Sequence, residues 1–285
     1  MAGRSTPAAA AVLASAAAER TAVFAFTCYT LETATGVIAA AAEAGRPVVL
    51  LVADSAFAAP SGPSLVRALR AVADAAPVPV FVQLDHCPDT GRIAAAVDAG
   101  AHAVLADGSR LPYEDNVAFT RAAVALASPH GVAVEAELGR IEGDEDTDRQ
   151  AAAGEGATDP AQAVDFAART GVDCLAVAVG NVHGSYRGEP RLDLDLLADI
   201  AARTGVPLAL HGASGVPDDV LARAIRGGAA KVNVNTELRR AAFAVLTARS
   251  GPLSEGLRTS VLVGELEESA RAVAAGRIAV AAHAS

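Results

Sequence analysis

Three of the six histidines in this chain come directly after short apolar runs. His86 follows VFVQLD, His183 follows CLAVAVGNV and His211 follows PLAL. Apolar runs of this length are typical of buried strands, and the carboxyl ends of the strands in a closed parallel barrel meet at one mouth. Three imidazoles that meet there match a catalytic zinc, which keeps a further position open for substrate. The spacing therefore predicts a zinc site on these three histidines.

Asp85 comes immediately before His86 and is a candidate for proton transfer. Neighbouring side chains of a strand point to opposite sides, but both can reach the mouth where the chain curls at the strand end. A carboxylate here could instead cap the next helix, although Asp89 and Thr90 are better placed for capping. We expect Asp85 to act as a general acid or base.

Two turns near the end of the chain indicate a phosphate site. HGASG spans residues 211–215 and NVNTE spans residues 233–237, and each precedes a predicted helix. Backbone amides and helix N-termini bind anions without lysine, and loops after the last two strands of a barrel often hold phosphate. A plain turn would account for HGASG alone. The two turns together favour a phosphate held by amides, Ser214 and Thr236.

A long acidic loop is expected over residues 139–159, GRIEGDEDTDRQAAAGEGATD. Loops of this length in a compact domain are lids or solvated linkers. As a lid, this loop could carry a carboxylate into the site, with Glu145 at the centre of its acidic run. Both readings stay open at this point.

The composition excludes several classes of protein. The chain has 285 residues, with 23 Lys+Arg against 33 Asp+Glu and a formal net charge of -10. Nucleic acids and anionic membrane surfaces bind proteins with clustered Lys and Arg. Because this chain is acidic, neither is the expected partner. Lys231 is the only lysine, and hence the only possible Schiff-base nucleophile. Three distant cysteines give no disulfide framework, and the N-terminus lacks a signal-peptide pattern, so a cytoplasmic location is expected.

Eight short apolar runs alternate with helix-length segments along the chain. The expected strands are residues 22–26, 47–53, 80–85, 102–107, 132–138, 174–180, 207–212 and 230–235. The expected helices between them are residues 31–45, 62–76, 89–100, 115–127, 159–171, 193–205 and 216–228. Most of these helices open on a capping residue or Pro, and several close on Gly. Apolar strands joined by helices indicate a parallel sheet that is covered on its faces.

The number of these units distinguishes two α/β architectures. A doubly wound open sheet would need a G-x-G-x-x-G turn after the first strand, and AFTCYTLETATG contains none. Eight units in about 250 residues have the size of a (β/α)8 TIM barrel. We therefore predict an α/β fold, a (β/α)8 TIM barrel with extra terminal helices at residues 1–19 and 253–285. No linker divides the chain, so residues 1–285 are expected to form a single domain.

Six blocks between residues 80 and 240 resemble a known family in sequence and order. They are LDHC, LADGSRLPYEDN, VEAELGRIEGDED, TDPAQAVDFAARTGVDCLAVAVGNVHGSYRGEPRLDLDLL, LHGASGVPDD and AKVNVNTELR. This set is similar to the class II, zinc-dependent ketose-bisphosphate aldolases, which include fructose-bisphosphate and tagatose-bisphosphate aldolases. The resemblance implies a lyase of carbohydrate metabolism such as glycolysis. Its reaction would be the reversible cleavage of a ketose phosphate or bisphosphate into dihydroxyacetone phosphate and an aldehyde.

The resemblance implies a metal site with two positions. Zn2+ would be bound by His86, His183 and His211, and an alternative metal position would use Asp107 and Glu137. A zinc Lewis acid that stabilises the enediolate removes any need for a Schiff-base lysine. The family also carries Lys at position 231, where its role looks structural.

The resemblance also implies roles in substrate binding and proton transfer. Asp85 would serve the aldehyde-derived hydroxyl, and Glu145 on the lid would take the proton from the ketone phosphate. Asn233 would lie near the enediolate. Dihydroxyacetone phosphate, with a monovalent cation near its phosphate, would be bound by Gly184, Gly212, Ala213, Ser214, Asn233, Asn235 and Thr236.

Four features depart from the family pattern. Gln83 stands where relatives often have His, and Ala213 replaces the second glycine of HGGSG. Thr27 and Cys28 stand in FTCYT, where relatives usually have an FNVN-like run. An Arg-bearing C-terminal stretch that contacts a distal phosphate in some members is not recognisable. These departures concern the aldehyde partner more than the metal or the dihydroxyacetone phosphate half.

Two alternative functions stay open. One is a catalytically silent family member that binds a sugar phosphate, and the other is an aldolase for a deoxy-gluconate phosphate. In each case the expected partner is a small-molecule sugar phosphate. A homodimer or homotetramer is expected from the resemblance. The terminal segments are expected to pack either on the barrel or on a neighbouring subunit.

Overall fold

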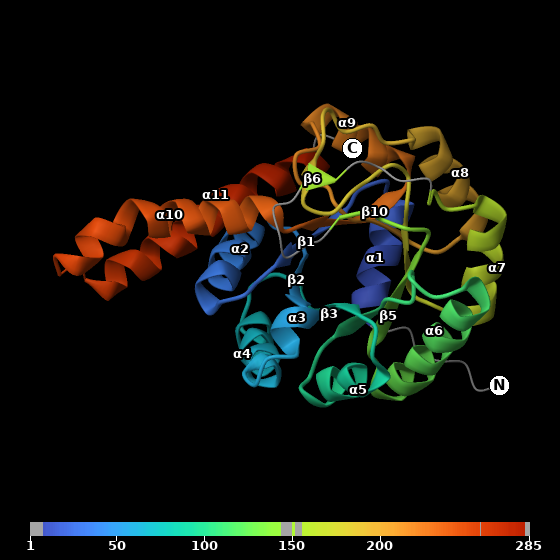
Figure 1. Ribbon diagram of the computed structural model, residues 1–285, viewed down its shortest axis with the longest axis horizontal. Coiled ribbons are helices and arrows are strands. Elements are labelled where there is room, and N and C mark those ends of the chain that lie inside the picture. Colours follow the sequence, from blue (N-terminus) through green and yellow to red (C-terminus); the bar gives the residue numbers. More distant parts are fainter. Residues whose placement is uncertain (1–7, 144–149, 152–155, 257, 283–285) are drawn as a thin grey trace.

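Eight parallel strands close into a barrel at the centre of the molecule (Figure 1). The computed structural model describes residues 8–143, 150–151, 156–256 and 258–282. The strands are β1 (Val23–Thr27), β2 (Val48–Ala53), β3 (Val80–Cys87), β4 (Ala103–Ala106), β5 (Ala133–Leu138), β7 (Cys174–Val177), β9 (Leu208–Leu210) and β10 (Ala229–Val234). Their order around the barrel is β1, β10, β9, β7, β5, β4, β3 and β2. This arrangement confirms the predicted (β/α)8 TIM barrel.

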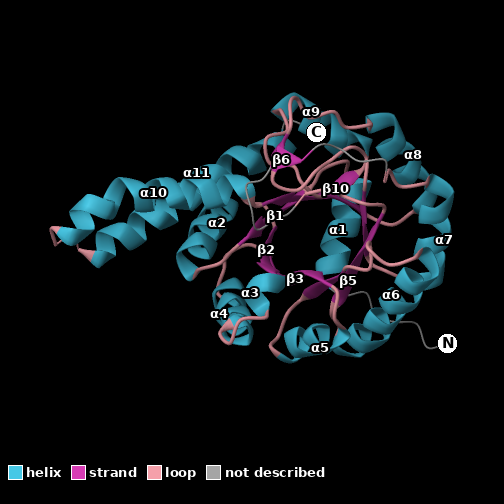
Figure 2. Ribbon diagram, in the orientation of Figure 1, coloured by secondary structure: helices cyan, strands magenta, loops and turns pink. Residues whose placement is uncertain are grey.

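Helices surround the strands (Figure 2). Those that follow strands are α2 (Leu31–Ala44), α3 (Asp54–Phe57), α4 (Gly62–Asp74), α5 (Thr90–Asp98), α6 (Tyr113–Ala127), α7 (Pro160–Thr170), α8 (Leu194–Thr204) and α9 (Asp218–Gly227). Asp89, Asp159 and Asp193 cap their helices by accepting hydrogen bonds from first-turn amides, as expected for N-cap carboxylates.

Alternation along each strand separates an inner from an outer core. In β1, Val23 and Ala25 belong to the cluster inside the barrel, whereas Phe24 and Phe26 belong to the larger cluster between strands and helices. This is the period-2 pattern of a strand that is buried on both faces. The same alternation determines which polar side chains of β3, β5 and β10 point into the barrel.

The helix α1 (Ala8–Ala18) lies across the amino-terminal end of the barrel (Figure 1). Its buried residues Ala9 and Leu13 pack in the inner cluster with Val23, Val49 and Phe81. The N-terminal segment therefore packs on the barrel, one of the two placements expected for it. This leaves the opposite, carboxyl-terminal end of the barrel as the mouth for a site.

The last two helices, α10 (Thr236–Ser254) and α11 (Thr259–Ala282), form an arm that extends away from the barrel (Figure 1). The arm is joined to the barrel where α11 packs on α2. A Cβ atom at Gly36 of α2 would lie 2.1 Å from the carbonyl oxygen of Glu267, so only glycine allows this close approach. Among the described residues, no helix is long and apolar enough to cross a membrane.

Some boundaries differ from the expected ones. The strand expected at residues 207–212 ends at Leu210, and the one expected at 174–180 ends at Val177. Each of these segments ends on a glycine with positive φ, Gly180 at +92° and Gly212 at +62°, which turns the chain out of the strand conformation. Two short strands that were not expected, β6 (Gln150–Ala151) and β8 (Ser185–Tyr186), pair with each other in a small sheet separate from the barrel. The expectation of one domain over residues 1–285 stays a prediction.

Candidate metal centre and phosphate loops

Three histidine side chains meet at the carboxyl-terminal mouth of the barrel. The ring centroids of His86 and His183 are 4.9 Å apart, those of His86 and His211 are 4.8 Å apart, and those of His183 and His211 are 5.9 Å apart. Glu137 of β5 joins them, and ligand atoms of all four residues lie within 4.8 Å of one another. The structure thus brings together the three histidines that the sequence singles out.

The backbone around these histidines is unusual. His86, near the end of β3, has a φ angle of +50°, a left-handed conformation that is uncommon outside glycine. The amide of His183 donates a hydrogen bond of 2.8 Å to the carbonyl of Glu142. Gly212, with φ +62°, turns the chain directly after His211. Local strain of this kind persists where the surrounding structure holds a side chain in one direction.

Asp107, at the end of β4, supports His86. Its Oδ2 atom lies 2.9 Å from His86 Nδ1, and its Oδ1 atom accepts hydrogen bonds from the amide and hydroxyl of Ser109. Burial opposes ionisation of Asp107, but the hydrogen bonds and charge of His86, together with Ser109, outweigh burial and hold its pKa well below the usual range. Asp107 is therefore an ionised carboxylate beside a candidate metal ligand.

The donor set at this mouth fits a divalent cation. His211 Nδ1 and Glu137 Oε2 face each other at 3.3 Å, and neither atom hydrogen-bonds to any residue that the structure describes. Burial disfavours a charge on His211, but the carboxylates of Glu135 and Glu137 outweigh burial and raise its pKa to about 9. The site therefore favours positive charge. Imidazole nitrogens with a carboxylate oxygen form a ligand set suited to zinc.

Asp85 lies beside this centre in β3, where it is completely buried. Burial lowers the pKa of Lys231, but the negative charges of Glu135 and then Asp85 outweigh burial and raise it above its usual value. Asp85 is thus close enough to Lys231 to influence its charge. A buried carboxylate next to the candidate metal ligands is suitably placed for proton transfer.

The predicted phosphate-binding residues lie on loops that contact one another at the mouth. Thr236 Oγ1 donates a hydrogen bond of 3.4 Å to the carbonyl of Gly184, and Tyr186 OH donates one of 2.9 Å to the carbonyl of Gly212. The loops after β7, β9 and β10 are therefore brought together. The remaining members of the predicted set are buried: Ala213, Ser214, Asn233 and Asn235.

Glu145, the expected lid carboxylate, lies outside the described residues. The described parts of its loop contact the segment that carries His183. Glu142 forms a parallel bridge with Val182, and Gln150 pairs with Ser185. Both flanks of residues 144–149 therefore attach next to the candidate metal centre.

Glu135 is a buried site residue that sequence reasoning did not single out. Its carboxylate contacts His211 at 2.7 Å, Lys231 at 2.7 Å and Gln83 at 2.9 Å. Burial opposes its ionisation, but Lys231 and His211 outweigh burial and hold its pKa well below the usual range. The signal was present in VAVEAEL, where Glu135 and Glu137 are two residues apart and so share the inner face of one strand.

Comparison with known proteins gives a consistent result. The family profile described as "Fructose-bisphosphate aldolase class-II" matches residues 8–284. The chain is 42% identical over 218 residues to a D-tagatose-1,6-bisphosphate aldolase subunit, GatY, of Klebsiella oxytoca, which covers 76% of this chain and 77% of that protein. It is 41% identical over 212 residues to a fructose-bisphosphate aldolase of Geobacillus stearothermophilus, covering 73% of this chain and 72% of the relative.

A solved structure shares the fold over nearly the whole length. The crystal structure of the YdjI aldolase from Escherichia coli K12 superposes with a TM-score of 0.85 at 31% identity, covering 97% of each chain. The similarity thus extends beyond the six sequence blocks to the terminal helices.

Proposed function

Because the chain belongs to the class II fructose-bisphosphate aldolase family, a family of lyases, we propose that it is a zinc-dependent aldolase. The reaction is the reversible cleavage of a ketose phosphate or bisphosphate into dihydroxyacetone phosphate and an aldehyde. One observation carries the proposal: His86, His183 and His211 converge with Glu137 within 4.8 Å at the barrel mouth. This mouth also holds the buried carboxylate of Asp85 and the loops proposed to bind phosphate.

His86, His183 and His211 would hold the metal, and Asp107 and Glu137 would offer the alternative position. Zinc bound there would supply the Lewis acidity that stabilises the negative charge of the enediolate. Lys231 takes no covalent part, because it is fully buried and paired with Glu135 at 2.7 Å.

The proton transfers are assigned to two carboxylates. In the cleavage direction, Asp85 takes the proton of the hydroxyl on the carbon that becomes the aldehyde. The carbon–carbon bond then breaks, and its electron pair stays with the dihydroxyacetone phosphate half as the enediolate. Glu145 donates a proton to the carbon of the dihydroxyacetone phosphate half at which the bond broke, which completes this product. Asn233 contacts the enediolate. Condensation reverses these steps.

Binding of the phosphate is assigned to backbone amides and small side chains of the loops after β7, β9 and β10. The helix α10 begins at Thr236, so its first amides and its dipole favour an anion there. The residues assigned to the phosphate half are Gly184, Gly212, Ala213, Ser214, Asn233, Asn235 and Thr236. We also assign a monovalent cation near the phosphate, a cytoplasmic location and a homodimer or homotetramer.

Metal content and hydrogen exchange test this function. The purified protein is expected to hold about one zinc per chain and to exchange one hydrogen of dihydroxyacetone phosphate with deuterium oxide, followed by NMR. His183→Ala is expected to lose most of the zinc and at least 100-fold of the exchange rate, because one of three ligands is removed. His130→Ala is the matched control, since His130 is exposed after α6 and outside the mouth.

The outcomes separate the candidate functions. Exchange by zinc-free protein, or exchange that survives His183→Ala, would contradict the mechanism. Binding of dihydroxyacetone phosphate without exchange would identify a catalytically silent member. A panel of aldehyde acceptors in the condensation direction then distinguishes a ketose bisphosphate from a deoxy-gluconate phosphate as the product.

A further inference from the structure

Five buried side chains form a hydrogen-bonded chain beneath the candidate metal centre. Glu135 Oε1 lies 2.7 Å from His211 Nε2, and Glu135 Oε2 accepts from Lys231 Nζ at 2.7 Å and from Gln83 Nε2 at 2.9 Å. Lys231 Nζ also donates to Asn233 Oδ1 at 2.9 Å. We call Gln83, Glu135, His211, Lys231 and Asn233 the Glu135 network. Each member is at most 3% exposed.

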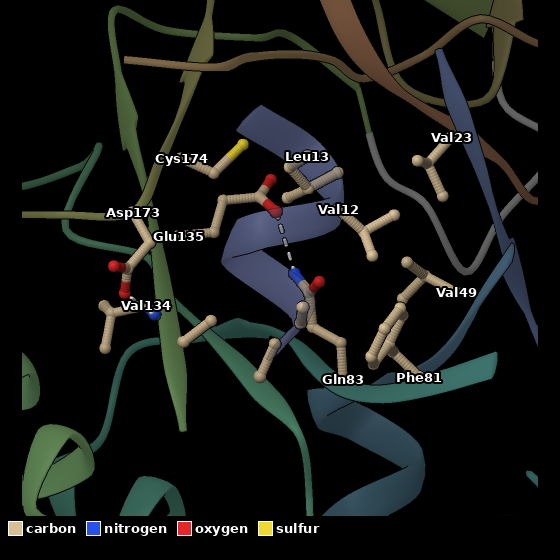
Figure 3. Close-up of a pocket in the computed structure, with 13 residues that line it drawn as sticks. Val12, Leu13, Val23, Val49, Phe81, Gln83, Val134, Glu135, Asp173 and Cys174 are labelled. Carbon is tan, nitrogen blue, oxygen red and sulfur yellow. Dashed lines mark hydrogen bonds between the residues drawn. The ribbon is translucent and has the colours of Figure 1, made fainter. Parts of the chain in front are cut away.

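Among the described residues, mostly apolar side chains close the amino-terminal end of the barrel next to this network. The space between α1 and the strands is a cavity of about 10 Å³, lined by apolar side chains that include Leu13, Val49 and Phe81 (Figure 3). This volume is at the lower limit for a single water molecule. Gln83 and Glu135 border the cavity and are joined to each other by a hydrogen bond (Figure 3).

A buried ion pair of this kind is not explained by stability alone. Removing a carboxylate and an ammonium from water costs more than their attraction often returns, and apolar side chains of the same size are frequently at least as stable. Lys231 is the only lysine in the chain, and it is used in this buried pair. The contacts of the pair instead indicate that it positions two groups at the mouth.

The first of these groups is the ring of His211. An ionised carboxylate only accepts hydrogen bonds, so Glu135 requires the hydrogen of a neutral His211 ring to be on Nε2. The other nitrogen, Nδ1, is then left as a lone-pair donor, and this atom faces Glu137 Oε2 at 3.3 Å. Carboxylates that hold the far nitrogen of a metal-binding histidine fix its orientation and increase its basicity.

The second group is the amide of Asn233. Because its Oδ1 atom accepts from Lys231, its Nδ2 atom is turned the other way. Asn233 Nδ2 is buried and makes no hydrogen bond with any described residue. A buried amide donor without a partner is available to an oxygen of a bound ligand.

We infer that Glu135 and Lys231 are positioning residues that orient the metal ligand His211 and the substrate donor Asn233 through one shared network. Gln83 supplies the remaining donor to Glu135, so the residue that departs from the family pattern still serves the network. The inference rests on the proposed function, because it takes His211 as a zinc ligand and Asn233 as a contact of the enediolate.

The test compares zinc affinity, measured by chelator competition, with the constants for hydrogen exchange of dihydroxyacetone phosphate. The main variant is Lys231→Met with Glu135→Gln, which removes both charges at nearly constant volume and leaves no charge buried alone. The expected result is a zinc affinity at least tenfold weaker and a several-fold higher KM for dihydroxyacetone phosphate. Thr170→Val is the control, because Thr170 is a buried hydroxyl of α7 outside the network, and it is expected to lower stability only.

Each outcome decides the inference. A folded double variant with the zinc affinity and KM of the natural chain would overturn it. If the double variant does not fold, Gln83→Leu takes its place, because that change keeps the ion pair and removes one donor to Glu135. Gln83→Leu is expected to weaken zinc binding several-fold, and an unchanged affinity would overturn the inference. If the natural chain binds no zinc and exchanges no hydrogen, the proposed function itself has failed.

Discussion

Gly212, directly after His211, allows a close contact between two backbone segments at the mouth of the barrel. Gly212 has φ +62°, and a Cβ atom there would lie 2.0 Å from the carbonyl oxygen of Val182. That carbonyl precedes His183, so the two histidines are held by backbones in direct contact. A side chain at position 212 would therefore separate the loops after β7 and β9.

The glycines of HGASG permit a matched comparison. Gly215 has φ +84°, but a Cβ atom there would have no atom of the described residues within 4 Å beyond its chain neighbours. Gly212→Ala and Gly215→Ala should each lower the free energy of unfolding by about 1 kcal/mol, because alanine is strained in the left-handed conformation. Only Gly212→Ala adds a clash with the backbone. We expect Gly212→Ala to raise the KM for dihydroxyacetone phosphate at least tenfold and Gly215→Ala to leave it within twofold. Equal KM values for the two variants would show that the close contact at Gly212 is unimportant.

Ala213 illustrates a departure that the structure explains. Ala213 is 1% exposed and belongs to the large core cluster outside the barrel. The extra methyl relative to HGGSG is thus accommodated by packing.

At the scale of elements, one arginine connects α11 to the loops proposed to bind phosphate. Arg277 Nε donates to Glu237 Oε2 at 2.7 Å, and its Nη1 atom donates to Asp218 Oδ1 at 2.8 Å. Glu237 Oε1 in turn accepts from the amide of Gly215 at 3.0 Å. The guanidinium thereby fixes the first turns of α9 and α10 relative to HGASG.

Replacement of Arg277 should therefore affect phosphate binding from a distance. We expect Arg277→Leu to lower the free energy of unfolding by about 1–3 kcal/mol, because Glu237 loses its charged partner, and to raise the KM for dihydroxyacetone phosphate several-fold. Arg271→Leu on the same helix is the control, since its pairs with Glu43 and Glu268 are at the surface and contribute little. Urea unfolding and exchange kinetics measure both effects. A KM unchanged by Arg277→Leu would argue against the connection.

The sequence predicts the elements better than the contacts between their side chains. Alternating apolar runs and capped helices suffice for the barrel, because strand order in a closed parallel sheet follows chain order. Strand ends likewise indicate His86, His183 and His211. The Glu135 network is different, since it joins residues of β3, β5 and β10 to His211, which directly follows β9. These partners depend on the strand registers around the whole barrel. The pairing of β6 with β8 also depends on two distant loops meeting in space.

At the scale of the whole molecule, the arm of α10 and α11 is the part that the barrel leaves uncovered. Phe243 is 60% exposed, Leu246 39% and Val261 42%. Phe243 and Leu246 are three residues apart on α10, so they share one face of the helix. They also border a cavity of about 470 Å³ that reaches Thr27 at the end of β1. Apolar side chains grouped in this way are typical of an interface.

We therefore expect two copies of the chain to associate through the arm, which would cover Phe243 and Leu246. Phe243→Glu should shift the protein toward the monomer, measured as molar mass by light scattering during size-exclusion chromatography. The reason is that a carboxylate on each copy would be buried without a partner.

Leu111→Glu is the matched control, because Leu111 is 46% exposed in the loop before α6 and away from the arm. If the molar mass of the oligomer is unchanged by Phe243→Glu, the interface lies elsewhere. A natural chain that is monomeric at micromolar concentration would contradict the expected dimer or tetramer. The two variants also show whether catalysis at the mouth depends on association, because the cavity beside Thr27 is also lined by residues of the arm. A loss of hydrogen exchange in Phe243→Glu alone would mean that a neighbouring copy completes the site.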